Sequence, residues 1–280
     1  SGYTAGGYTG SYSNVIDKFS FASNANATDV GDSTFSGNGR AGQSSGTHGY
    51  NSGGDSSGSV TNIIEKYSFT VDGNATDVGD LSVARKGMAG QSSETHGFAS
   101  GGHSSNDQID KFPFASNSNA TDHGDLTVAA YYPAGQSSET HGYTSGGGAP
   151  RNNVIDKFSY ASNSGATDHG DITVSRGDSP GGQSSQTHGF TSGGAGGSNN
   201  TIDKFAFGSN NNATDVGDLS AARIYCSGQS STTHGYTAGG SGSSTNMDVI
   251  DKFAFATNNN ATDVGNLTVA RRVAGGGTQY

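Results

Sequence analysis

The chain has 280 residues, 47 of them glycine, and a formal net charge of −10 with 14 basic residues. This length suits one large all-β domain, and the acidic balance disfavours a nucleic-acid partner. A single cysteine, Cys226, excludes an internal disulfide framework. No apolar run approaches the ~20 residues that a membrane-spanning helix needs, so we expect no membrane insertion.

One pattern recurs six times along the chain, at a spacing of roughly 46 residues. Its clearest copy, 108–147, contains four short segments separated by turns rich in Gly, Asn or Ser, and such segments are typical of β-strands. In chain order they are QIDKFPF, ATDHGDLTV, AGQSS and HGYTSGG, which we name strands c, d, a and b. Strand c is marked in every copy by an isoleucine, at Ile16, Ile64, Ile109, Ile155, Ile202 and Ile250.

The two ends of the chain distinguish a closed ring from an open array. The chain ends AGGGTQY and begins SGYTAGG, and these segments, joined, align without gaps to AGQSSETHGYTSGG of the third copy. The end therefore supplies strand a, and the start supplies strand b, of one shared blade, which is how a propeller closes. We predict an all-β, six-bladed β-propeller with four-stranded blades. It forms a single domain over 1–280, whose closing blade is shared by 1–35 and 274–280.

The internal order of the repeat resembles that of known propellers. An arginine, the inner strand, [YF]-x-x-GG, a variable loop and x-[DE]-x-[FY] follow one another as in the kelch repeat, over the whole chain. Kelch copies usually carry a tryptophan in strand d, and this chain has none. The segments IDKF, NATDVGD, GQSS and HGYTSGG are also similar to propeller-like repeats of bacteriophage virion and tail proteins. The first resemblance implies a propeller, and the second implies a place on a virus particle.

Aromatic and charged residues recur in strand c. The aromatic residues of strands b and c are expected to pack as core between blades. An acid and a lysine also follow one another there, and adjacent strand residues point to opposite faces. We therefore hypothesise that each acid meets the lysine of the next blade, in a structural ring of six ion pairs. Its members are Asp17, Lys18, Glu65, Lys66, Asp110, Lys111, Asp156, Lys157, Asp203, Lys204, Asp251 and Lys252.

Two recurring patterns resemble metal sites. Five equivalent histidines lie too far apart around a ring to share one ion, so we expect them to order the a–b hairpin: His48, His96, His141, His188 and His234. The D-x-G-D runs resemble fragments of calcium loops but supply too few oxygens, and turn chemistry explains them. We predict no metal and no cofactor, with calcium as the alternative. The N-A-T sequons are interpreted as turn asparagines.

The loops fall into two classes. The a–b and c–d loops are nearly the same in all copies, whereas the b–c and d–a loops differ, and the second pair shares one face of the ring, which we call the variable face. Tyrosine and arginine, which often anchor interfaces, gather there. We predict a binding face made of Tyr8, Tyr12, Arg85, Lys86, Tyr131, Tyr132, Arg151, Arg176, Asp178, Arg223, Tyr225, Arg271 and Arg272.

Four of these arginines also recur at the end of strand d. For Arg85, Arg176, Arg223 and Arg271 the alternative is that they bond neighbouring loop carbonyls instead of a ligand.

Catalysis is not expected, because an active site needs an asymmetric set of groups and the polar residues here recur in most copies. A kelch-like oxidase would need Tyr, His and Cys to converge, whereas Tyr225 and Cys226 lie opposite the repeated histidines. Two functions remain. One is a phage tail or virion-surface module, extracellular, that binds a host-surface glycan or receptor through the variable face. The other is a structural virion subunit that docks another particle protein.

Overall fold

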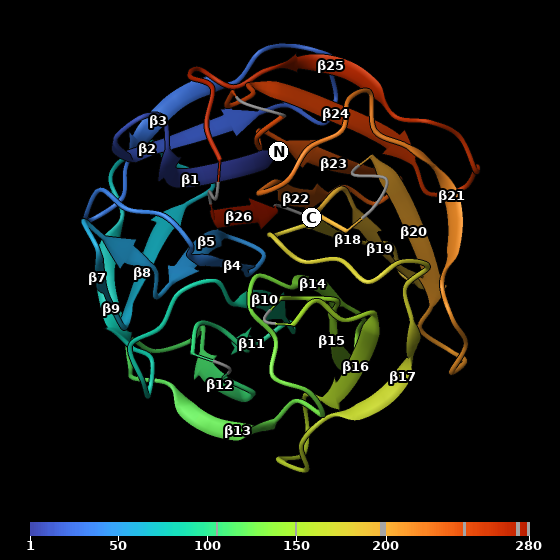
Figure 1. The fold of residues 1–280 in the computed structure, drawn as a ribbon. Coiled ribbons are helices and arrows are strands. Elements are labelled where there is room, and N and C mark those ends of the chain that lie inside the picture. Colours follow the sequence, from blue (N-terminus) through green and yellow to red (C-terminus); the bar gives the residue numbers. More distant parts are fainter. Residues whose placement is uncertain (105, 149, 197–199, 243–244, 273–274, 279–280) are drawn as a thin grey trace.

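The computed structural model describes the chain except residues 105, 149, 197–199, 243–244, 273–274 and 279–280. Six four-stranded antiparallel sheets surround a central axis, so the predicted six-bladed propeller is confirmed (Figure 1). The described part of the chain contains no helix long and apolar enough to cross a membrane.

Each blade runs from a four-residue inner strand at the axis to a five-residue outer strand at the rim. From inside outward, blade 1 is β4 (Ala41–Ser44), β5 (His48–Ser52), β8 (Ile63–Ser68) and β9 (Thr76–Asp80). Blade 2 is β10 (Ala89–Ser92), β11 (His96–Ser100), β12 (Gln108–Pro113) and β13 (Thr121–Asp125). Blade 3 is β14 (Ala134–Ser137), β15 (His141–Ser145), β16 (Val154–Ser159) and β17 (Thr167–Asp171).

The remaining blades follow the same plan. Blade 4 is β18 (Gly181–Ser184), β19 (His188–Ser192), β20 (Thr201–Ala206) and β21 (Thr214–Asp218). Blade 5 is β22 (Ser227–Ser230), β23 (His234–Ala238), β24 (Val249–Ala254) and β25 (Thr262–Asn266). Blade 6 is β26 (Gly275–Thr278), β1 (Gly2–Tyr8), β2 (Tyr12–Phe19) and β3 (Thr28–Asp32). A small hairpin, β6 (Asp55–Ser56) and β7 (Ser59–Val60), lies in the b–c loop of blade 1.

The ring closes through strands from the two ends of the chain, as predicted. β26 pairs antiparallel with β1, with Thr278 opposite Gly2 and Gly275 opposite Ala5. β26 also contacts the inner strands of both neighbouring blades, β4 and β22, at the centre of the ring (Figure 1). One blade thus joins the two ends by main-chain hydrogen bonds.

Aromatic rings fill the space between blades, which confirms the predicted core. The strand b ring of one blade stacks on the second strand c ring of the next, as Tyr143 does on Phe207 with centroids 4.6 Å apart. Phe190 stacks on Phe255 in the same way at 4.8 Å. Buried clusters of this composition recur around the ring and join each blade to its neighbour. The fold is therefore held mainly by contacts between blades.

Glycine in the inner strands lets the blades meet at the axis. A Cβ atom on Gly90 would lie 2.0 Å from the carbonyl oxygen of Gly42 in the preceding blade. One on Gly182 would lie 2.1 Å from the carbonyl oxygen of Gly135. A side chain at either position would force the main chains apart. The high glycine content is thus a packing requirement of the ring.

The Asp residues of strand d and the Asn residues of the c–d turns bond the main chain. Oδ1 of Asp29 accepts a hydrogen bond from the N–H of Gly31 at 3.1 Å, but both residues lie inside β3, where the pairing with β2 is irregular, so the interpretation of the D-x-G-D runs as turns is wrong. Oδ1 of Asn74 accepts one from the N–H of Asp32 in the preceding blade at 3.0 Å. The same inter-blade bond recurs in four further pairs, Asn119–Asp80, Asn212–Asp171, Asn260–Asp218 and Asn26–Asn266. These asparagines therefore link neighbouring blades at the rim.

Candidate binding site

A ring of buried ion pairs joins the blades, but its cations are arginines. Arg271 reaches Asp17 in the next blade at 3.0 Å, and Arg85 reaches Asp110 at 3.1 Å. The further pairs are Arg40–Glu65, Arg176–Asp203 and Arg223–Asp251. A serine or threonine at the end of strand d adds hydrogen bonds to the same carboxylate, as Thr268 does to Asp17. The predicted inter-blade ring of acids therefore exists.

The hypothesis that lysines complete this ring is wrong. Each lysine is next to an acid in a strand and projects from the opposite side, where it meets aromatic rings. Lys111, Lys157, Lys204, Lys252 and Lys18 lie over the strand b ring of their own blade, at 5.7 to 5.9 Å from the centroid. Lys66 donates to the side chain of Asn117 at 3.2 Å. For five of the six acids, the preceding d–a loop supplies an arginine as the cation instead.

Four of the predicted binding residues are consequently structural. Arg85, Arg176, Arg223 and Arg271 are only 1–2% exposed. Nη1 of Arg176 donates to the carbonyl oxygens of Gly193 and Thr201, at 3.1 and 3.0 Å. Arg223 and Arg271 bond main-chain carbonyls in the same manner, and Arg85 bonds the carbonyl oxygen of Ala99 at 2.9 Å. The alternative stated for these four arginines, bonding to neighbouring carbonyls, is observed, but several of these carbonyls belong to strands and not to loops.

One blade junction lacks the arginine. Ala130 occupies its position, and the carboxylate in the next blade, Asp156, is bonded by the N–H and hydroxyl of Thr127 at 2.9 and 2.6 Å. Burial raises the pKa of Asp156 above its usual value, and the hydrogen bonds from Thr127 offset part of that shift. We expect the same rise in pKa at the other acids of the ring if their arginines are removed.

The d–a loops are tied to one another by main-chain bonds around the axis. The N–H of Gly87 donates to the carbonyl oxygen of Gly39, and the N–H of Tyr132 to that of Gly87, both at 2.8 Å. Ser179 then bonds Tyr132, and Cys226 bonds Ser179, both at 3.0 Å. We call this series of bonds the collar. Because the collar uses main-chain atoms only, it leaves the loop side chains free to differ.

Aromatic side chains cross the mouth of the ring on the variable face. Tyr132 and Tyr225 come from loops separated by a third d–a loop, 176–180, yet their ring centroids are 5.6 Å apart. Tyr131 lies 4.3 Å from Tyr132 by the same measure. The series continues in both directions through His103 beside Tyr131 and Arg272 over Tyr225 and Tyr8. We call the whole set the aromatic band: His103, Tyr131, Tyr132, Tyr225, Arg272, Tyr8 and Tyr12.

Two tyrosines of the aromatic band have an unusual main-chain conformation. Tyr132 and Tyr225 lie two residues before their inner strands and have φ of 53° and 58°. At the same position two other copies have glycine, Gly39 and Gly87, with φ of 67° and 69°. A bulky residue in the left-handed region costs of order 1–3 kcal/mol and persists where the surroundings enforce it. Such strain concentrates at functional sites.

The charged residues of the variable face are mostly paired. Lys86 bonds Asp55 in the b–c loop of blade 1, and Arg151 bonds Asp178 at 3.0 Å. Asp178 also accepts from the hydroxyl of Tyr225 at 3.3 Å. Burial, followed by the nearby carboxylate of Asp178, raises the pKa of Tyr225, so its hydroxyl stays protonated and can donate. Of the predicted binding residues, the structure brings five tyrosines and Arg272 into one site and places Asp178, Arg151 and Lys86 beside it.

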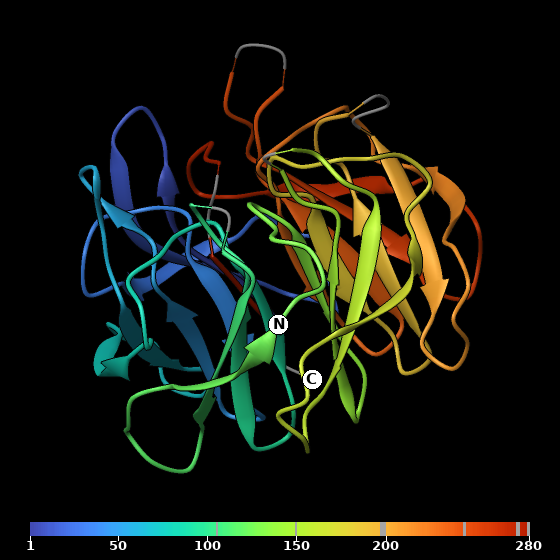
Figure 2. The ribbon, with the colours of Figure 1, turned by 60° about the horizontal axis from the view of Figure 1, so that its bottom comes forward.

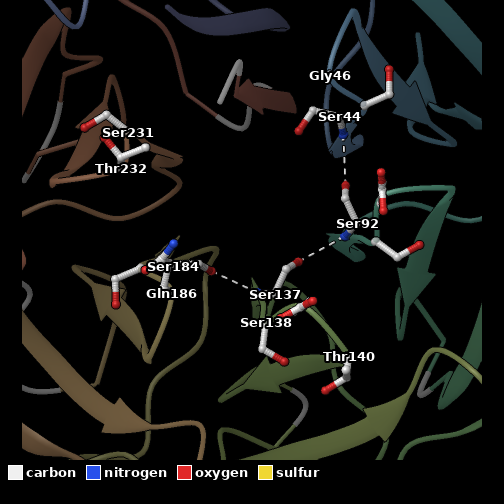
Figure 3. Close-up of a pocket in the computed structure, with 15 residues that line it drawn as sticks. Ser44, Gly46, Ser92, Ser137, Ser138, Thr140, Ser184, Gln186, Ser231 and Thr232 are labelled. Carbon is white, nitrogen blue, oxygen red and sulfur yellow. Dashed lines mark hydrogen bonds between the residues drawn. The ribbon is translucent and has the colours of Figure 1, made fainter.

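The opposite face carries a cup that the sequence did not lead us to expect. The a–b hairpins surround a cavity of about 910 Å³, lined by serine, threonine, glycine, glutamate and glutamine (Figure 3). At its base the N–H of Ser44 donates to Oγ of Ser92, Ser92 to Ser137 and Ser137 to Ser184, at 2.9–3.0 Å. Below this the bore has a volume of only about 70 Å³. In the sequence, the S-S-x-T-H segment that follows five of the six inner strands could have predicted this polar cavity.

The repeated histidines order the a–b hairpins, as predicted. Nδ1 of His48 lies 2.9 Å from the hydroxyl of Thr47, and the N–H of His48 donates to Oγ of Ser45. Burial, and then the charge of Lys66, lowers the pKa of His48, and the same direction holds at the four equivalent histidines. Among the residues that the structure describes, no three His, Cys, Asp or Glu side chains are grouped to hold a metal ion.

No family model matches the chain, and a comparison with curated proteins found no match.

Proposed function

We propose that this protein is a non-enzymatic recognition module, a phage tail or virion-surface component, that binds a host-surface glycan through the aromatic band. The observation that carries the proposal is the continuous series of rings across the mouth of the ring, with Tyr132 and Tyr225 in left-handed conformations. Tyrosine offers an apolar face for a sugar ring and a hydroxyl for hydrogen bonds. Single-copy residues build this site, whereas the rest of the fold uses repeated ones.

The surroundings of the band suit a polar ligand. The b–c loops that flank it project from one side of the ring, and the β1–β2 hairpin that carries Tyr8 and Tyr12 is one of them (Figure 2). Amide, carboxylate and hydroxyl groups lie beside the rings, including Asp178 and the hydroxyl of Tyr225. Aromatic surface with a few placed polar groups is the usual composition of a small-ligand site.

The virion context is supported by the segments IDKF, NATDVGD, GQSS and HGYTSGG, which are similar to repeats of bacteriophage virion and tail proteins. The composition, which is low in lysine and has one cysteine, also suits an extracellular particle protein. A structural virion subunit is the second candidate function. The collar favours it to the extent that it makes the variable face a rigid surface on which another particle protein could dock.

A kelch-like oxidase is the least favoured function. Cys226 is 3% exposed, and burial raises the pKa of its thiol to about 11. The side chain of Tyr225 turns toward the variable face, where it contacts Tyr132 and Asp178. A buried, protonated thiol is a poor nucleophile and metal ligand.

The test is binding of the purified chain to intact candidate host cells and to their extracted polysaccharides. A variant with Tyr131→Ala, Tyr132→Ala and Tyr225→Ala removes the centre of the band. The matched control replaces three exposed valines outside it, Val83→Ala, Val128→Ala and Val174→Ala, which are 41–49% exposed. We expect saturable binding by the wild type and the valine variant, and at least a tenfold loss in the tyrosine variant. No binding by the folded wild type would favour the structural subunit.

A further inference from the structure

Arg272 differs from the other arginines of the chain. The six others each have a carboxylate within 4.0 Å: Arg40, Arg85, Arg151, Arg176, Arg223 and Arg271. Arg272 has none among the described residues, and its guanidinium makes no hydrogen bond with them. Its contacts are the faces of Tyr8, at 5.3 Å, and Tyr225, at 5.8 Å. All five N–H donors of this group therefore remain for a ligand.

The main chain fixes the position of Arg272. Its carbonyl oxygen accepts from the N–H of Tyr8 at 2.9 Å, and its N–H donates to the carbonyl oxygen of Tyr8 at 3.1 Å. The carbonyl oxygen of Tyr8 also accepts from the side chain of Asn246 at 2.8 Å. With a fixed main chain and two rings beside it, the guanidinium loses little freedom when a ligand binds.

The charges around Arg272 define the ligand more closely. Lys86 is neutralised by Asp55, and Arg151 by Asp178, so the band carries one uncompensated cation within a protein of net charge −10. A single guanidinium matches a single carboxylate, which it binds with two parallel hydrogen bonds. A phosphate monoester carries about −1.5 to −2 charge and a dense array of sulfates carries more, so both would need more than one cation for neutralisation. We propose that the ligand is an acidic glycan, and that a uronic or sialic acid carboxylate docks on Arg272 while its sugar ring lies on the neighbouring tyrosines.

This inference rests on the proposed glycan-binding function, and its experiment separates the two. The full chain is titrated with a uronic-acid polysaccharide, with polysialic acid and with the same polymers after their carboxyl groups are reduced to alcohols. Dextran sulfate is the probe for a general attraction to anions. The variants are Arg272→Gln, Arg272→Lys and, as a control with the same change of charge away from the variable face, Lys66→Gln, whose native side chain bonds Asn117. Thermal unfolding establishes that each variant is folded.

We expect one of the carboxylated polymers to bind, and carboxyl reduction to weaken it at least tenfold. Arg272→Gln should cause the same loss, with no further loss on the reduced polymer, because both changes remove one contact. Arg272→Lys should be intermediate, and Lys66→Gln should change affinity less than about threefold. Equal binding of native and reduced polymers, or a preference for dextran sulfate, would contradict the proposal that a carboxylate docks on Arg272. Either result would leave the proposed glycan binding standing. A folded chain that binds no polysaccharide, host extracts included, would overturn the proposed function as well.

Discussion

The two faces of the ring are built from the same repeats and use their side chains differently. On the cup face the hairpin side chains recur from copy to copy and bond one another or the main chain, as Ser44, Ser92 and His48 do. On the variable face the loops are joined by main-chain bonds of the collar, and their side chains differ in every copy. The difference shows that a repeat fold can accommodate a unique site where the main chain alone holds the loops together.

Two neighbouring residues show this difference at its sharpest. Arg271 is 1% exposed and pairs with Asp17 inside the ring, whereas Arg272 lies on the rings of Tyr8 and Tyr225 at the variable face. The first belongs to the repeat, and the second belongs to this site alone. The predictions below test whether fold and site are separable in this way.

The largest expected effect is on stability, at the buried ion pairs. Arg223→Met removes the cation and leaves the carboxylate of Asp251 buried without it, so the free energy of unfolding should fall by about 3–5 kcal/mol. Lys252→Met, at the residue next to Asp251, removes a cation that lies over Tyr236 at 5.9 Å and should cost less than about 1 kcal/mol. Urea unfolding of both variants measures the contrast. Equal losses would mean that the lysines share in holding the blades.

A smaller, pH-dependent gain is expected where the arginine is missing. Burial raises the pKa of Asp156 above its ordinary value of 3.8. The carboxyl group therefore ionises in the unfolded chain before it does in the folded protein, and the free energy of unfolding falls as the pH rises from 3.8 through the raised pKa. Ala130→Arg supplies the missing cation and should increase the free energy of unfolding by about 1–2 kcal/mol at pH 7. The gain should disappear as the pH falls and Asp156 is protonated. A gain that is the same at pH 3 and pH 7 would exclude an ion pair as its cause.

The smallest expected effect on stability is at the site itself. Tyr225→Gly removes an aromatic ring but also relieves a φ of 58°, at a position where other copies have glycine. We expect the free energy of unfolding to stay within about 1 kcal/mol of wild type while glycan affinity falls at least tenfold. The control is Tyr143→Gly, at a core ring that is 1% exposed, which should cost about 3–5 kcal/mol. A comparable loss in both variants would make Tyr225 part of the core.

The sequence was sufficient to predict the ring, because strand spacing and the phase-shifted ends are local patterns with one topological solution. It was also sufficient for the hairpin histidines, whose partners lie within a few positions, but it assigned the D-x-G-D residues to turns, whereas Asp29 and Gly31 lie inside β3. It predicted a ring of acids but assigned it the wrong cation. The hypothesis paired each acid with the lysine of the next blade, as Asp203 with Lys252, whereas Asp203 pairs with Arg176, which lies 27 residues before it.

The site was predictable as a set of residue types and not as a geometry. Arg271 and Arg272 are adjacent, and nothing in the sequence indicates that the first is buried and the second lies at the variable face. The difference depends on the side of the loop to which each side chain points. Propensity also opposes a left-handed conformation at Tyr132 and Tyr225, so only the equivalence with Gly39 and Gly87 could have indicated it. The contact between these two rings depends on loop paths that no pattern in the sequence specifies.

The collar gives this architecture the properties of a display scaffold. Its bonds at Gly39, Gly87, Tyr132, Ser179 and Cys226 run from N–H to carbonyl, so they exclude proline as a donor and need no particular side chain, while the left-handed φ of the first four favours glycine there. The side chains beside these bonds can therefore be exchanged between copies, or diversified in a library, without dismantling the ring. Substitutions in one variable loop at a time could therefore change the ligand specificity of the face, while the residues that form the blades stay the same.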